Sequence, residues 1–359
     1  MFSPQERALR KLVRDYQSLN ASCLDELDTP PSPLEFSKFV AANRPFVVRG
    51  GGRGIPALEK WTDEYLVEKL AEKEVQVSVS RGDADSVVTD DNGEEVFVEP
   101  ASVPMTLKAF FKHLEEEEEE DEDKTGEEKP VFYLQSQDGN MGKEFEALRE
   151  DVGAEGPSWA REVFGEAPDA VNLWVGGGKS RTAMHKDPYE NVYMVVRGTK
   201  TFTLLPPTEF YCLHEQEYPH ATYSFSPPSS LSITRTTPEM RIPWTPVDPT
   251  NPDLDAHPRL KLARPLTVTL EKGDMLYLPA LWFHHVTQTT SPFSSSPSSC
   301  PSSPPSSSSA QGIKSMLSVN YWYDMRMEGS FYATMQYLRR QVLALDGRED
   351  PREEDSEEE

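Results

Sequence analysis

Two residues that can bind a metal ion, His185 and Asp187, are separated by a single position in the segment TAMHKDPYENVY. The residues after them are strand formers, and in a strand positions i and i+2 project from the same face of the sheet. The imidazole and the carboxylate are therefore expected to converge. An H-x-D pair alone occurs often by chance, so its meaning depends on a further ligand.

A later segment, WFHHV, offers that ligand as one of two adjacent histidines, His284 and His285. One of them must face the interior of the fold, but strand alternation does not choose between them. Two histidines and one carboxylate, with further coordination positions left open, form the facial triad of non-haem Fe(II) oxygenases. A structural zinc site would instead need four ligands, mostly Cys or His, which this sequence does not supply.

A lysine in an apolar strand adds to this pattern. Lys200 lies in a segment in which Phe202 and Leu204 share its face. A lysine directed inward requires an anionic partner, because an unpaired buried ammonium is very costly. A dicarboxylate co-substrate would be such a partner.

The elements that must hold these residues are mainly strands. From residue 131 onward the chain contains short segments rich in β-branched and aromatic residues, with no helical periodicity between them. They are VFYLQ, VNLWV, NVYMVV, TFTLL, LTVTL, MLYLP, WFHHV and MLSVNYWY. The pattern predicts a mostly β fold with flanking helices, built as an antiparallel double-sheet barrel of the jelly-roll type, a double-stranded β-helix.

The segments outside this core are expected to flank it. Residues 1–130 are interpreted as a helical and β extension packed on a core that spans 131–324, and residues 325–347 as a C-terminal helix. Ser3, followed by Pro4 and Glu6, predicts the start of an N-terminal helix. The C-terminal helix has one apolar stripe, made of Phe331, Met335, Leu338, Val342 and Leu345. This stripe could close one end of the barrel or pair two subunits in a homodimer.

Four segments are predicted to lack regular structure. Residues 115–128 contain eleven acidic residues and one lysine, and the tail at 348–359 contains eight acidic residues and two arginines. Residues 291–310 contain 12 serines and five prolines, a composition typical of a disordered insertion. Residues 226–259 are expected to be irregular because prolines block strand pairing there: Pro243, Pro246, Pro249 and Pro252.

Composition excludes some classes of protein. The 359 residues include 36 basic and 61 acidic ones, a net charge of −25, which argues against partners that are nucleic acids or anionic membranes. The two acidic segments hold most of this charge. The three cysteines are far apart, and neither an 18-residue apolar run nor a secretory signal is found. We expect a cytoplasmic protein, with the nucleus as an alternative.

Several motifs together resemble the JmjC family of iron- and 2-oxoglutarate-dependent oxygenases. They are H-K-D at 185–187, N-V-Y-M-V-V-R-G-T-K at 191–200, G-D-M-L-Y-L-P-A-L-W-F-H-H-V at 273–286 and V-N-Y-W-Y at 319–323. The segments P-S-P-L-E-F, R-P-F-V-V-R-G and Y-L-Q extend the resemblance across nearly the whole chain. The acidic run and the Ser/Pro-rich insertion depart from the family pattern, but both fall between predicted elements.

The resemblance implies roles for individual residues. The metal ligands would be His185, Asp187 and His284, since the W-x-H match selects the first of the adjacent histidines. The residues that would bind 2-oxoglutarate are Tyr133, Thr182 and Lys200 at its distal carboxylate, and Asn191 and Asn320 beside its chelating end. Trp322 would line the substrate pocket.

The activity that the resemblance implies is hydroxylation of a lysine at C3 in a protein. Fe(II) would be the metal and 2-oxoglutarate and O2 the co-substrates, with succinate and CO2 formed. The expected partner is a GTP-binding protein related to translation factors. Glu190 and Asp324 are candidates for an acidic pocket mouth that would suit a lysine.

Three alternatives stay open at this stage. The same iron site could demethylate methyl-lysine or cleave histone tails, or the barrel could be a binding module without turnover. A serine or zinc peptidase is disfavoured, because neither G-x-S-x-G nor H-E-x-x-H occurs. A binding module is disfavoured because the triad and Lys200 are all present.

Overall fold

The computed structural model describes the chain in five stretches, which are residues 2–119, 129–137, 139–227, 230–289 and 315–350. The predicted Ser/Pro-rich insertion at 291–310 lies outside them, as do residues 120–128 and 351–359 of the two acidic segments. Residues 115–119 of the acidic run, which we expected to be irregular, instead continue helix α5 (Leu107–Glu119).

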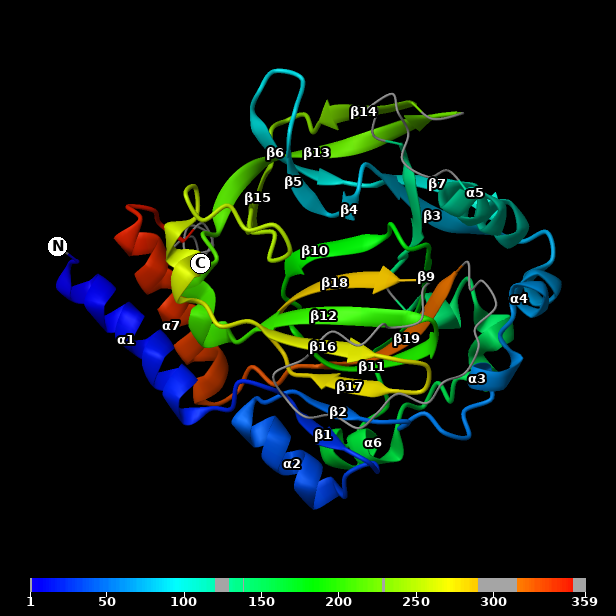
Figure 1. Cartoon of the computed structure of the whole chain (residues 1–359), viewed down its shortest axis with the longest axis horizontal. Helices are drawn as coiled ribbons and strands as arrows, with labels where there is room; N and C mark the ends of the chain where they lie inside the picture. The colour runs from blue at the N-terminus through cyan, green and yellow to red at the C-terminus, as the bar shows by residue number, and fades with distance from the viewer. Residues whose placement is uncertain (1, 120–128, 138, 228–229, 290–314, 351–359) are drawn as a thin grey trace, which may run out of the picture.

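Two facing sheets form the centre of the molecule (Figure 1). In the described residues, the larger sheet has nine strands in the order β1-β2-β17-β11-β19-β9-β8-β3-β7, and the smaller has the order β16-β12-β18-β10-β4. The strands of the larger sheet are β1 (Asp25–Leu27), β2 (Phe46–Val48), β3 (Glu74–Ser80), β7 (Ala101–Thr106), β8 (Val131–Leu134), β9 (Ala170–Gly176), β11 (Tyr189–Arg197), β17 (Met275–Leu278) and β19 (Met316–Asp324). The strands of the smaller sheet are β4 (Asp83–Ala84), β10 (Arg181–His185), β12 (Thr199–Leu205), β16 (Leu266–Leu270) and β18 (Phe283–Thr289).

The central strands pair as predicted. Strand β11 is antiparallel to β17 and β19, and β12 is antiparallel to β16 and β18. Each apolar segment predicted as a strand from residue 131 onward forms one. The prediction of a mostly β fold of the jelly-roll type with flanking helices is therefore confirmed.

Strand β11 explains how the two faces of the larger sheet differ. Tyr193 and Val195 face the interior between the sheets, whereas Val192 and Met194 face a second core on the outside of the larger sheet. Helices α2 (Pro33–Ala42) and α6 (Ser158–Phe164) cover that outer face, and Phe36 of α2 is fully buried there. Because both faces of β11 are covered, the strand is mostly apolar on both sides. The few polar residues within it are therefore the ones to examine for a function.

The predicted extension at 1–130 also supplies strands to the barrel. Strands β2 and β3 join the larger sheet, and β4 pairs in parallel with β10, which carries His185. Residue 131 is therefore not a structural boundary between an extension and a separate core.

A third sheet lies against the barrel beside β10 and corrects our prediction for residues 226–259 (Figure 1). It has the order β14-β13-β6-β5, with β15 also paired to β13. Its strands are β5 (Ser86–Thr89), β6 (Glu95–Glu99), β13 (Gln216–Ser226), β14 (Ser230–Arg235) and β15 (Arg241–Trp244). The expected irregular segment thus contains two strands. Pro243 is tolerated because β15 is a short strand that pairs with β13 alone, as is typical of prolines at sheet edges.

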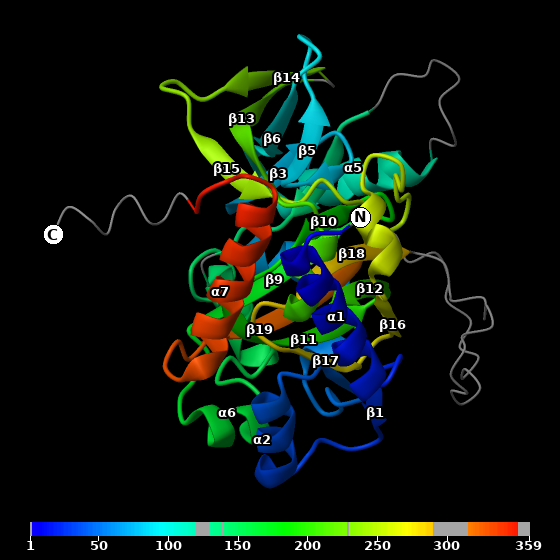
Figure 2. The same ribbon diagram turned by 90° about the vertical axis from the view of Figure 1, so that its left-hand side faces the viewer.

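Helices α1 (Pro4–Leu19) and α7 (Ser330–Leu345) lie side by side across one end of the barrel (Figure 2). The Ser3 side chain caps α1 by accepting from the amide of Glu6, as predicted. Leu338 and Val342 of the C-terminal stripe are buried in one cluster with Leu9 and Val13 of α1. The stripe therefore closes the barrel end within the chain, which removes the reason to expect a dimer through it.

The remaining helices lie at the edges of the larger sheet. They are α3 (Ala57–Lys60) and α4 (Asp63–Leu70), with α5 beside β3 and β8. None of the helices in the described stretches is long and apolar enough to cross a lipid bilayer.

Candidate metal and co-substrate site

The imidazoles of His185 and His284 meet because their strands pair in register. Strand β10 ends at His185, β18 begins next to His284, and the two residues are direct antiparallel partners with ring centroids 4.1 Å apart. Asp187 follows β10 rather than lying in it. Its backbone carbonyl is held by the amide of Leu281 at 2.9 Å.

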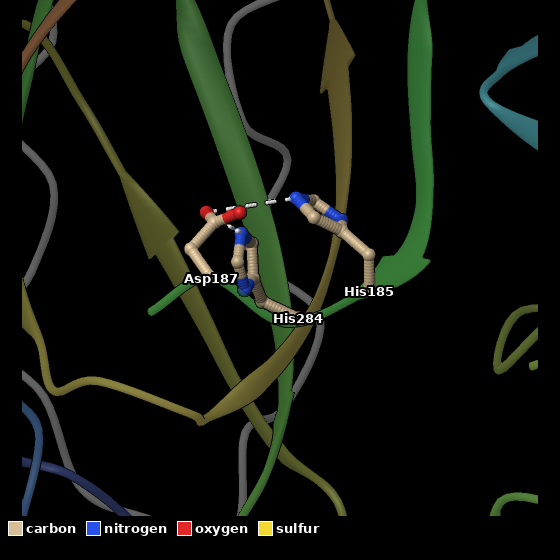
Figure 3. Close-up of side chains that lie close together, drawn as sticks. All are labelled: His185, Asp187 and His284. Carbon is tan, nitrogen blue, oxygen red and sulfur yellow. Dashed lines mark ion pairs between the residues drawn. The ribbon is translucent and has the colours of Figure 1, made fainter. Parts of the chain in front are cut away.

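The three side chains converge on one point (Figure 3). A carboxylate oxygen of Asp187 lies 3.7 Å from Nε2 of His185 and 3.6 Å from Nε2 of His284. One donor atom from each residue lies within 4.8 Å of the others. Two nitrogens and one oxygen with this arrangement could hold a divalent transition metal as a facial triad.

Backbone hydrogen bonds fix which ring nitrogens are free to bind a metal. Nδ1 of His185 lies 2.8 Å from the carbonyl of Ala183, and Nδ1 of His284 lies 3.1 Å from the carbonyl of Trp282. Each Nδ1–H can donate to its carbonyl, which leaves the lone pair of Nε2 directed at the common point. Burial, together with the adjacent His185, lowers the pKa of His284 to about 4, so the imidazole of His284 is neutral and able to coordinate at neutral pH.

The adjacent histidine, His285, faces the other way. It is buried on the opposite face of β18, with Nε2 3.9 Å from a carboxylate oxygen of Asp83. The structure therefore brings His284, and not His285, to His185 and Asp187. Strand alternation required one histidine to face inward, and the register with β10 is what selects it.

A cavity between the sheets adjoins the three ligands. Eight of the predicted site residues line it, together with residues that the sequence analysis did not identify as part of the site. The predicted ones are Tyr133, Thr182, His185, Asp187, Asn191, His284, Asn320 and Trp322. The others are Gln137, Trp174, Tyr193, Phe202 and Val286. A β-bulge in β10 lets Thr182 and His185, three positions apart, both face the cavity.

Lys200 lies fully buried behind this cavity. Its ammonium donates to the hydroxyl of Tyr133 at 3.2 Å and lies over the rings of Tyr133 and Tyr193. Within the described stretches no carboxylate forms an ion pair with it, and burial lowers its pKa to about 7. Burial also raises the pKa of the Tyr133 phenol, which the side chain of Thr182 contacts by a hydrogen bond. A buried ammonium with only neutral partners fits a ligand carboxylate.

Further polar groups in the cavity have no partner in the described chain. Oδ1 of Asn191 and Nε1 of Trp322 are buried without a hydrogen bond. Asn320 accepts from Nε1 of Trp174 at 3.0 Å, and the ring of Trp322 stacks on Tyr189 at 4.7 Å. A bound keto acid carries only acceptor oxygens, so the indole N–H of Trp322 is the one of these two groups that it could satisfy.

Of the two acidic residues considered for the pocket mouth, one is excluded. Glu190 is half-buried on the opposite face of β11, where its carboxylate accepts from the hydroxyl of Tyr277 at 2.6 Å, and desolvation raises its pKa. Asp324 is exposed at the end of β19. A carboxylate that we had not considered, Asp85, lies near His185; burial raises the Asp85 pKa to about 6, against an opposing effect of the nearby His185.

The fold and the ligand geometry together define the class of protein, a double-stranded β-helix with a two-histidine, one-carboxylate site. Residues 31–329 match the family described as a cupin-like domain. The chain is 35% identical over 304 residues to the human protein named bifunctional peptidase and (3S)-lysyl hydroxylase JMJD7, with 84% of each chain covered. It is 34% identical over 326 residues to JmjC domain-containing protein E of Dictyostelium discoideum, with 86% of each covered.

A third relative has a different name. The chain is 31% identical over 347 residues to lysine-specific demethylase JMJ32 of Arabidopsis thaliana, with 93% of this chain and 91% of that protein covered. The chain belongs to the cupin-like JmjC family of 2-oxoglutarate-dependent oxygenases.

Proposed function

We propose that this protein is an Fe(II)- and 2-oxoglutarate-dependent protein hydroxylase that acts on the side chain of a lysine. His185, Asp187 and His284 would hold the metal. The observation that carries the proposal is Lys200, a buried ammonium without a carboxylate partner in the described chain, behind the cavity on which the triad opens. In this proposal, a site for a divalent metal and a site for a dicarboxylate adjoin each other.

The residues of the cavity have separate tasks in this proposal. Lys200, Tyr133 and Thr182 bind the distal carboxylate, and they orient the keto acid so that its other end reaches the metal. Asn191 and Asn320 lie beside that chelating end. The aromatic side chains of the cavity exclude water from the reaction.

The chemistry follows from the co-substrates. Bound Fe(II) would supply the activation of O2 that a protein side chain cannot provide. One oxygen atom enters a C–H bond of the substrate, and the other enters succinate as 2-oxoglutarate loses CO2. The chain contributes binding, orientation and protection of the reacting atoms.

A cationic side chain is the proposed substrate because an acidic residue, Asp85, lies near the proposed metal ligand His185. Asp85 follows β4, which pairs with β10, and its carboxylate accepts from the side-chain amide of Gln135 at 3.3 Å. In the described stretches neither a lysine nor an arginine pairs with it. The human relative is named for (3S)-lysyl hydroxylation, which supports a lysine at C3. A GTP-binding protein related to translation factors is the proposed partner, and the cytoplasm the proposed location.

Intact-mass measurement of lysine peptides, after incubation with Fe(II), 2-oxoglutarate and O2, tests the proposal. The expected product carries one additional oxygen atom, in amounts equal to the succinate formed. Loss of a methylene from a methylated peptide would indicate demethylation, as in the name of the Arabidopsis relative. Shorter fragments would indicate the peptidase activity that the human name includes.

A further inference from the structure

The residue between the proposed metal ligands, Lys186, contacts a different part of the molecule from its neighbours. Its ammonium lies 4.7 Å from the centre of the Phe283 ring and 5.1 Å from that of Phe210. It also lies 3.4 Å from a carboxylate oxygen of Glu215. Lys186 lies between His185 and Asp187, and Phe283 directly precedes His284. The contact between Lys186 and Phe283 therefore joins the two chain segments that carry the proposed metal ligands.

Glu215 extends this contact to helix α7. Its other carboxylate oxygen accepts from Nε and Nη2 of Arg339 at 2.9 and 2.8 Å. Nη1 of Arg339 donates to Asp350 at 2.5 Å. The side chains of Glu215, Arg339 and Asp350 are only 8, 6 and 3% exposed, so these charges interact with little screening by solvent.

We infer that Lys186, Glu215, Arg339 and Asp350, called here the Lys186 cluster, position the metal ligands. The inference rests on the proposed metal site. Asp187 lies beyond the end of β10, so strand pairing does not fix it, and the Leu281 amide holds only its carbonyl. The contacts of Lys186 are the second interaction that holds this turn in place. Glu215 connects them to Arg339 of α7.

The physical consequence concerns metal affinity. Ligands that are held in the binding geometry before the metal arrives lose less conformational freedom when it binds. Removal of groups that orient metal ligands typically lowers metal affinity by about 10- to 100-fold. The Lys186 cluster does not touch the metal, so its residues are positioning residues and not catalytic ones.

The test compares the affinity of the full chain for Mn(II) in four variants, by electron paramagnetic resonance of the free ion. Lys186→Met keeps the apolar stem over the two rings and removes the ammonium, and Glu215→Gln removes the carboxylate that both cations share. Asp346→Asn is the control, because it breaks another ion pair at the C-terminal end of α7, with Arg259 at 2.9 Å, that contacts neither residues 185–187 nor the side chain of Glu215. Thermal unfolding of each variant without metal is measured in parallel.

The inference predicts about tenfold weaker Mn(II) binding in Lys186→Met and no change in Asp346→Asn. Glu215→Gln is expected to weaken Mn(II) binding as well, and Lys186→Arg to restore part of the affinity. Unchanged binding in both Lys186→Met and Glu215→Gln would reduce the cluster to a structural contact of α7. An equal loss in the control would also overturn the inference, because loosening of α7 would then be the cause. If the unmodified protein does not bind Mn(II), the proposed function itself fails.

Discussion

Lys200 should destabilise the protein in the absence of its ligand, and Lys200→Met should show this. The ammonium is fully buried, and burial lowers its pKa from 10.5 to about 7. At about 1.4 kcal/mol per tenfold change in acidity, the charged form carries a penalty of about 5 kcal/mol. Methionine fills a similar volume without a charge. It loses the hydrogen bond to Tyr133, worth about 1 kcal/mol.

The pH dependence distinguishes this effect from ordinary repacking. Between pH 7 and 10.5 the unfolded chain binds more protons at Lys200 than the folded chain does, so the free energy of unfolding rises with pH in this window. Below pH 7 both states are protonated and the penalty is fully present. Lys200→Met should therefore raise the free energy of unfolding by about 4 kcal/mol at pH 6.5 and by almost nothing at pH 10.

Urea denaturation at the two pH values, without 2-oxoglutarate and in buffers free of carboxylates, measures this difference. Lys272→Met is the matched control, because that lysine is half exposed and, in the described part of the chain, its ion pair is with an exposed glutamate, Glu59. It should change stability little at either pH. In parallel, calorimetric titration of 2-oxoglutarate into the Mn(II)-loaded protein should show a loss of more than about 100-fold in affinity for Lys200→Met. Equal stability changes at both pH values, or an unchanged affinity, would refute the reasoning.

Three further changes test other parts of the site. Asp187→Ala should abolish succinate formation coupled to peptide oxidation. It should leave the unfolding temperature nearly unchanged, since the residue lies in a turn and not in a core. Coupled turnover equal to that of the unmodified protein would rule out the ligand assignment. Tyr133→Phe removes the hydrogen bond to Lys200 and should raise the KM for 2-oxoglutarate about fivefold, as initial rates at varied co-substrate would show. Asp85→Asn should raise the KM for a lysine peptide on the order of tenfold, with kcat nearly retained; an equal effect on a peptide with norleucine in place of lysine would argue against a charge contact.

The strands of the barrel were predictable because their residues are apolar on both faces. Segments such as 191–196 and 316–323 face the core between the sheets on one side and the core beneath the helices on the other. They are therefore rich in apolar residues on both faces. Strand β3, EVQVSVS, was missed although it alternates strictly and its valines are buried. The two strands within 226–259 were missed because prolines stand on either side of β14 and inside β15. Prolines argue against central strands but not against short edge strands.

The candidate site was predictable where the residue type itself is unusual, and less so where only geometry matters. A lysine among apolar residues drew attention, as did the H-x-D pair. Three of the other lining residues lie two positions from a predicted one: Tyr193 follows Asn191, Phe202 follows Lys200, and Val286 follows His284. Strand alternation could have identified these three. Asp85 could not have been found this way, because a parallel pairing across distant parts of the chain brings it near His185.

The central claim is that one cavity couples decomposition of 2-oxoglutarate to oxidation of a lysine side chain. Incubation of the Fe(II)-loaded protein with a lysine peptide under oxygen-18 gas, followed by mass spectrometry of peptide and succinate, tests it most directly. The account predicts one heavy oxygen atom in the lysine side chain for each heavy oxygen atom in succinate, and neither label in the Asp187→Ala variant. Label in succinate alone, or a modified peptide without label, would contradict it.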